Sequence, residues 1–143
     1  MQVITIEGVE HRIDCNAFTP FIYSENFTTF RADGREVHED INAAIDDVTA
    51  FIREHDMPPM GKLLQLFWAF EKTAEKPTDE VKVPRFREWL RDLPTSTLRL
   101  DDKEGWAFEV LEFVTENFFP TSAKADVEAT PAEDEAATTS TGA

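Results

Sequence analysis

The chain has 143 residues, 41% of them hydrophobic, and a formal net charge of −15 at pH 7. This length suits one domain with a single core. The negative charge opposes binding to nucleic acid and to anionic membrane surfaces, because both are negatively charged themselves. Since Cys15 is the one cysteine, the chain can form neither an internal disulfide nor a cluster of thiolate metal ligands.

The first 15 residues predict a β-hairpin, because residues 3–6 and 11–15 are short β-type runs on either side of a turn at residues 7–10. A lone hairpin is only marginally stable, so we expect it to lie against helices. The sequence does not open with a basic stretch followed by a long apolar run. We therefore expect no signal peptide and a cytosolic protein.

A short helix is predicted to start at Thr19, which can cap the free amides, with Pro20 in the first turn. Its apolar side would consist of Phe21, Ile22, Phe27 and Phe30. We expect this helix to end near residues 32–34. Residues 36–55 then predict a strongly amphipathic helix, with apolar residues at spacings of three and four and acidic residues between them.

The most apolar stretch lies at residues 58–73, where Gln65 is the one polar residue between Leu63 and Phe70. A helix that is apolar almost all round belongs in the middle of a domain. It is too short to cross a bilayer, which needs about 20 apolar residues. We therefore expect the helix of residues 36–55 and the remaining segments to pack around it.

Residues 83–94 predict a short helix bounded by prolines, with an apolar side and a basic side. The basic side consists of Lys82, Arg85, Arg87 and Arg91. Two interpretations of this side remain open. The cations could form a solvated face that complements the acidic helix of residues 36–55, or they could lie at the edge of a partner contact site with Trp89 as its anchor.

The last helix is predicted at residues 101–119, with acidic residues in its first turn that suit the helix dipole. Three aromatic residues fall partly off its apolar stripe: Phe108, Phe113 and Phe119. They indicate either a wide buried face or an exposed contact patch. We take them as exposed candidates for partner binding, together with Trp89 and the three arginines of the preceding helix.

Residues 120–143 are rich in Ala, Thr and Ser and include five acidic residues. Such a segment cannot bury enough apolar area to offset the entropy of ordering it, so we predict a disordered acidic tail. The sequence thus predicts a single mainly α-helical domain at residues 1–119, in which a small N-terminal β-hairpin packs on a bundle of about five helices.

No arrangement of residues in the sequence points to catalysis. The three histidines lack the Glu-x-x-His and His-Glu-x-x-His spacings of metal sites. Two prolines precede Gly61 and Lys62, so these residues do not continue a phosphate-binding loop. Cys15 has no reliable base nearby in the sequence. We therefore expect a binding protein that is not an enzyme and holds neither a metal nor a cofactor.

The order of these pieces resembles the tail assembly chaperones of long-tailed bacteriophages with non-contractile tails. Four stretches carry the resemblance: the opening hairpin, residues 17–27, the central residues 63–74 with Trp68-Ala69, and a closing pair at residues 86–90 and 106–111 with Phe118-Phe119-Pro120. Residues 31–36 depart from the family, because they form a polar turn where many relatives are more apolar.

The resemblance implies a small, mainly helical protein that acts in the host cell cytoplasm and is absent from the mature virion. Such a chaperone binds the tape measure protein, keeps it soluble and helps to recruit tail tube subunits, and self-association remains open. Two other functions also remain open: a structural minor tail or connector protein of the virion, and an acidic inhibitor that occupies a basic site on a host protein.

Overall fold

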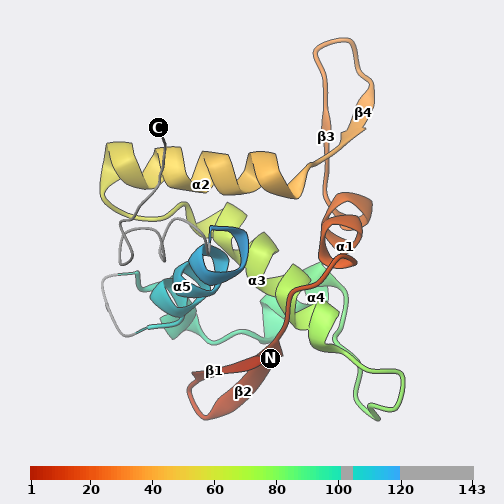
Figure 1. The fold of residues 1–143 in the computed structure, drawn as a ribbon, viewed down its shortest axis with the longest axis vertical. Helices are drawn as coiled ribbons and strands as arrows, with labels where there is room; N and C mark the ends of the chain where they lie inside the picture. Colours follow the sequence, from red (N-terminus) through yellow and green to blue (C-terminus); the bar gives the residue numbers. More distant parts are fainter. Residues whose placement is uncertain (101–104, 120–143) are drawn as a thin grey trace, which may run out of the picture. The chain divides into compact units, whose positions relative to one another are not determined.

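The computed structural model describes residues 1–100 and 105–119 (Figure 1). The elements in chain order are β1 (Gln2–Ile6), β2 (Val9–Ile13), α1 (Thr19–Asn26), β3 (Thr28–Phe30), β4 (Glu36–His38), α2 (Ile41–His55), α3 (Met60–Ala74), α4 (Phe86–Asp92), the 3₁₀ helix η1 (Thr95–Leu98) and α5 (Trp106–Phe118). The predicted fold class is confirmed, because the described residues form five α-helices after an N-terminal β-hairpin. The predicted tail lies outside the described residues.

The chain divides into two compact units, Met1–Val110 and Leu111–Ala143, and α5 crosses the boundary between them. The first unit holds both hairpins and the first four α-helices. In the described part of the second unit, α5 continues to Phe118.

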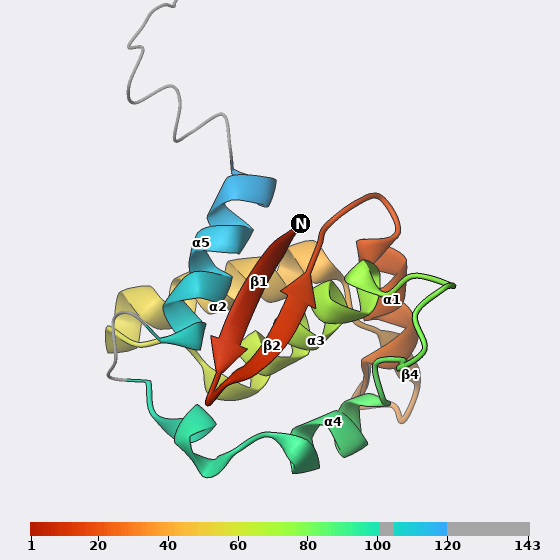
Figure 2. The same cartoon turned by 90° about the horizontal axis from the view of Figure 1, so that it is seen from below.

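The β1–β2 hairpin packs on α3 and closes with a two-residue turn (Figure 2). Glu7 and Gly8 both have positive φ, 49° and 82°, as a tight hairpin turn that matches the twist of the strands requires. The buried side chains of the hairpin include Ile4, Ile6 and Ile13. The backbone N–H of Asp14 donates to the carbonyl oxygen of Phe70 on α3 at 3.0 Å, so the predicted packing of the hairpin on a helix is confirmed.

The prediction that the side chain of Thr19 caps the first helix is wrong. Thr19 lies inside the first turn of α1, where it is fully buried. Its Oγ1 accepts a hydrogen bond from the backbone N–H of Asn16 and lies 3.0 Å from Oγ1 of Thr73 on α3. The hydroxyl therefore attaches α1 to α3, and the N-terminal amides of α1 receive no side-chain cap.

A second β-hairpin, which was not predicted from the sequence, follows α1. The helix ends at Asn26 and not near residues 32–34, because residues 28–30 are β-branched or aromatic and form β3. β3 pairs antiparallel with β4, and Gly34 has a φ of 87° in the loop between them. Figure 1 shows this ribbon extending beyond α1 and α2.

The helix predicted at residues 36–55 starts later than expected, because its first residues form β4. α2 begins at Ile41, and Asp40 caps it by accepting a hydrogen bond from the backbone N–H of Ala43 at 3.0 Å. The helix ends at His55, followed by Asp56 in the left-handed conformation with a φ of 58°. The predicted amphipathic helix is thus confirmed over Ile41–His55.

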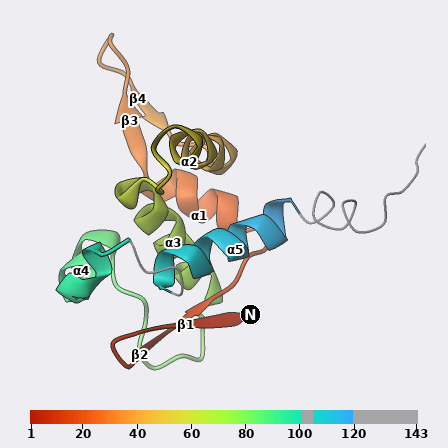
Figure 3. The same ribbon diagram turned by 90° about the vertical axis from the view of Figure 1, so that its left-hand side faces the viewer.

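α3 is the central helix of the first unit, as predicted, and β2, α1, α2 and α4 all contact it. Eight of its side chains are buried: Leu63, Leu64, Leu66, Phe67, Trp68, Ala69, Phe70 and Ala74. Figure 3 shows α2 along its axis, next to α3. The buried side chains of α2 are Ile41, Ala44, Ile45 and Val48. No helix in the described part of the chain is both long and apolar enough to span a membrane.

Candidate partner-binding site

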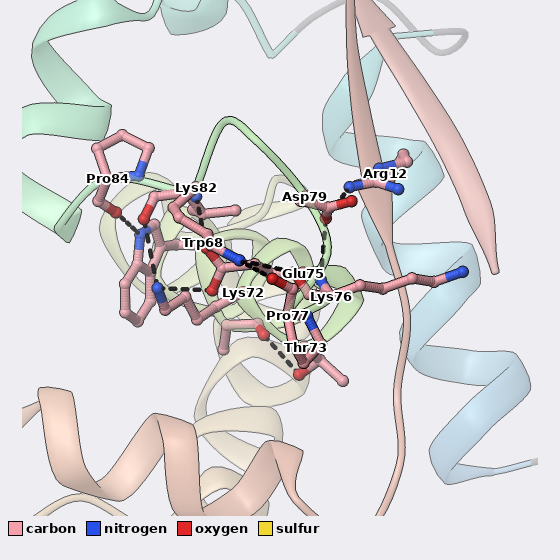
Figure 4. Close-up of polar contacts among 12 residues, drawn as sticks. Arg12, Trp68, Lys72, Thr73, Glu75, Lys76, Pro77, Asp79, Lys82 and Pro84 are labelled. Atoms are coloured by element: carbon pink, nitrogen blue, oxygen red, sulfur yellow. Dashed lines mark hydrogen bonds and ion pairs between the residues drawn. The ribbon is translucent and has the colours of Figure 1, made fainter.

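The loop between α3 and α4 is fixed to α3 by a set of hydrogen bonds (Figure 4). Nε1 of Trp68 donates to the carbonyl oxygen of Pro84 at 2.9 Å, and Nζ of Lys72 donates to that of Val83 at 3.3 Å. The backbone N–H of Val83 donates to the Glu75 carboxylate at 2.9 Å, and the same carboxylate pairs with Lys72. These contacts attach Val83 and Pro84, which come shortly before α4, to α3 and to Glu75 at its end.

A second carboxylate fixes the far end of the same loop. Asp79 accepts a hydrogen bond from the backbone N–H of Lys76 at 2.9 Å and forms an ion pair with Arg12 on β2 (Figure 4). The Lys76 N–H and then the Arg12 guanidinium lower the pKa of Asp79. Burial raises the pKa of Glu75, but the contacts with Lys72 and with the Val83 N–H outweigh burial and leave that pKa lowered.

The expectation that Trp89 is an exposed anchor for a partner is wrong. Its side chain is 3% exposed, and its Nε1 donates to Oε1 of Glu71 on α3 at 3.0 Å. The same oxygen lies 2.8 Å from Nδ1 of His11 on β2. The Trp89 ring also meets the ring of Phe67 edge to face, with centroids 5.3 Å apart. Trp89 therefore attaches α4 to the core.

The three arginines of this region are exposed, as a contact surface requires. Arg87 and Arg91 are four residues apart and lie on one flank of α4, and Arg85 precedes its first turn. Within the described residues no ion pair involves any of the three. We refer to Arg85, Arg87 and Arg91 as the arginine face. Lys82 is not part of it, because its Nζ donates to the carbonyl oxygens of Lys76 and Pro77.

The predicted aromatic candidates of α5 do not share one environment. Phe108, in the first unit, is half-buried. In the second unit, Phe113 is 5% exposed and Phe119 is 40% exposed. The expected exposure is therefore wrong for Phe113. It is correct for Phe119, whose role in partner binding stays a prediction.

An apolar groove that was not predicted from the sequence lies between the α2–α3 connection and the residues at and after the end of η1. It has a volume of about 720 Å³. Its lining consists of Phe51, Asp56, Met57, Pro58, Pro59, Met60, Leu98, Arg99 and Leu100. Met57 is 47% exposed and Leu98 is 64% exposed, so the groove presents large apolar side chains to solvent. We call this feature the apolar groove.

Sequence patterns gave no direct signal for the apolar groove. The run Met57-Pro58-Pro59-Met60 predicts a helix boundary, and Leu98 and Leu100 belong to no periodic stripe. An indirect signal that could have indicated the groove is the concentration of apolar residues in a connection between helices, where polar residues are the norm.

The chemistry available elsewhere in the described residues is limited. Burial raises the pKa of the Cys15 thiol, the hydrogen bond with Thr19 lowers it in part, and the Asp14 charge raises it further. The thiol is therefore protonated at neutral pH and is a poor nucleophile. No group of three or more His, Cys, Asp or Glu side chains in the described part of the chain is arranged to hold a metal ion.

Comparisons of the chain with protein-family models, with curated proteins and with solved structures find no match.

Proposed function

We propose that this chain is a tail assembly chaperone, which binds an apolar face of the helical tape measure protein in the apolar groove and keeps that protein soluble. The observation that carries the proposal is the exposure of Met57 and Leu98 in a groove with a largely apolar lining. An amphipathic helix binds such a groove by burying the apolar side chains of one face. Methionine suits this role because its flexible side chain fits partners of different shape.

The size and lining of the groove favour a protein segment over a small polar ligand. Its volume of about 720 Å³ accommodates several large side chains. Asp56 and Arg99 are the charged residues of the lining, and the other lining residues are apolar. The net charge of −15 supports the proposal, because surplus charge keeps a complex with an apolar partner in solution.

In this function the chain acts in the host cell cytoplasm, helps to recruit tail tube subunits and leaves before the virion is complete. Its work is binding, without catalysis.

The test is co-expression of the tape measure protein with wild-type chain or with Met57→Asp or Leu98→Asp. Each aspartate places a carboxylate in the apolar groove, so we expect binding to weaken by about tenfold or more and the tape measure protein to become insoluble. The matched control is Val81→Asp, which changes a valine that is 86% exposed and lies outside the groove. A tape measure protein that is soluble alone, or equal behaviour of the three variants, contradicts the proposal.

Two further measurements separate the alternatives. Mass spectrometry of purified particles should find no copy of this chain, whereas a minor tail or connector protein would remain in them. A complex held by apolar contacts should survive about 0.5 M salt, whereas an acidic inhibitor bound to a basic site should dissociate.

A further inference from the structure

We propose that the arginine face of α4 binds an acidic stripe on a helix of the partner protein. This inference rests on the proposed function only in taking the partner to be a protein. It concerns a different surface from the apolar groove and adds the charge pattern that the partner must carry.

The arginines are displayed on an element that is attached to the core. Trp89 joins α4 to Glu71, and Trp68 joins the preceding residue Pro84 to α3. A fixed cation loses little conformational freedom when it binds, so more of the interaction energy remains for affinity. Arginine also forms two parallel hydrogen bonds with one carboxylate, which favours a partner with carboxylates at set positions.

Within the described residues, these cations form no ion pair, although the protein is acidic. The chain has 29 acidic and 14 basic residues, yet none of the described carboxylates lies within ion-pair distance of Arg85, Arg87 or Arg91. Two of the arginines, Arg87 and Arg91, belong to α4 itself and are about one helical turn apart. Carboxylates four residues apart on a partner helix have the same spacing.

The cationic surface of α4 is narrow. Successive residues of a helix are about 100° apart, so Glu88 and Asp92 line the flank of α4 next to Arg87 and Arg91. A nucleic acid duplex, which presents phosphates on a broad surface, would meet these carboxylates and the net charge of −15. A partner helix with a single acidic stripe can contact the flank with Arg87 and Arg91 without meeting Glu88 and Asp92.

Leu90 provides an apolar contact next to the same flank. It is half-buried, and it precedes Arg91 on α4. A partner helix that places carboxylates on the arginines can therefore also cover part of the Leu90 side chain, which distinguishes a helix from a soluble dicarboxylate.

The experiment uses the full chain and two synthetic helical peptides, one with glutamates four residues apart along one face and one with glutamine at the same positions. Binding is followed by NMR through the backbone amides of residues 85–92. We expect the glutamate peptide to shift these signals and the glutamine peptide to leave them unchanged. The variant Arg85→Gln/Arg87→Gln/Arg91→Gln should weaken binding of the glutamate peptide by at least about tenfold.

The matched control is Arg31→Gln/Arg35→Gln/Arg53→Gln, which removes three exposed arginines that lie outside both the arginine face and the apolar groove and changes the net charge equally. For this control we expect the affinity for the glutamate peptide to change by less than about twofold. Equal weakening by the two triple variants would show that net charge alone matters, and it would overturn the proposal. Absence of shifts with the glutamate peptide, or tighter binding of a DNA duplex at residues 85–92, would also overturn it.

These outcomes are independent of the proposed function. Failure of the peptide experiment leaves the groove and the co-expression test unaffected. Conversely, equal behaviour of Leu98→Asp and Val81→Asp in the co-expression test would contradict the proposed function and would leave the peptide experiment on the arginine face unaffected.

Discussion

At the scale of single residues, two buried threonines differ in what their hydroxyls contact. Thr19 is fully buried, and its Oγ1 bonds to the Asn16 N–H and to Thr73. Thr97 is 3% exposed, and its Oγ1 is the one buried side-chain polar atom of the described residues without a hydrogen-bond partner. An unpaired buried hydroxyl costs free energy, whereas a paired one stabilises.

We therefore predict opposite effects of the same substitution at the two sites. Thr97→Val should raise the free energy of unfolding by about 1 kcal/mol, because it removes an unsatisfied hydroxyl at nearly constant volume. Thr19→Val should lower it by about 1 to 3 kcal/mol, because it leaves the Asn16 N–H without its acceptor. Urea unfolding of both variants provides the measurement, and the same sign for both would contradict the argument.

Left-handed backbone at two non-glycine residues gives a second prediction. Glu7 and Asp56 have φ of 49° and 58°. At each position, glycine should be more stable than alanine by about 1 kcal/mol, because alanine pays a steric cost in this region. Because both the glycine and the alanine variant lack the carboxylate, the difference in stability between them does not include the effect of losing that group. The control is Glu54 on the exposed side of α2, where alanine should be the more stable of the two by about 1 kcal/mol.

At the scale of elements, the loop between α3 and α4 depends on ionised carboxylates. Glu75 and Asp79 have lowered pKa values in the fold, against ordinary values of 4.5 and 3.8. Their stabilising contribution is fully present above the ordinary values and is lost as pH falls through the lowered ones. Acid should therefore release the loop from α3 and from β2.

We predict that the amide protection factors of Lys76 and Val83 fall as pH drops below about 4, since these N–H groups donate to the two carboxylates. Hydrogen exchange, corrected for the intrinsic effect of pH, measures this change. In Asp79→Asn the protection factor of the Lys76 amide should lose most of its pH dependence, and in Glu75→Gln that of the Val83 amide should do so. An unchanged profile in these variants would assign the effect to other groups.

The elements also show which patterns were predictable from sequence. α2 and α3 were predicted because a long run of regularly spaced apolar residues is a local property of the sequence. The predicted start of α2 at residue 36 was too early, because Asp40 caps the helix and α2 begins at Ile41. The end of α1 was not predicted, because Phe27 and Phe30 fit an apolar helix side as well as a strand. Phe27 is buried, whereas Phe30 is 73% exposed in β3.

At the scale of the whole molecule, the surfaces proposed for binding differed in how far the sequence could predict them. Exposed arginines on a short helix were predictable, because charge clusters are read directly from the sequence. The burial of Trp89 was not, because Glu71, which accepts its hydrogen bond, and His11, whose ring it contacts, lie 18 residues and more before it in the chain. The apolar groove likewise joins residues near 57 and near 98, and no local pattern connects them.

The shared Glu71 carboxylate also bears on how the chain folds while it is translated. The β1–β2 hairpin leaves the ribosome before α3 does, and His11 is 60 residues from Glu71, whose oxygen it contacts. Because an isolated two-stranded hairpin is only marginally stable, it must wait for α3 to emerge before it settles. α4 then attaches to the same oxygen, so the hairpin, although it is synthesised before α3, reaches its final state only after α3 has emerged.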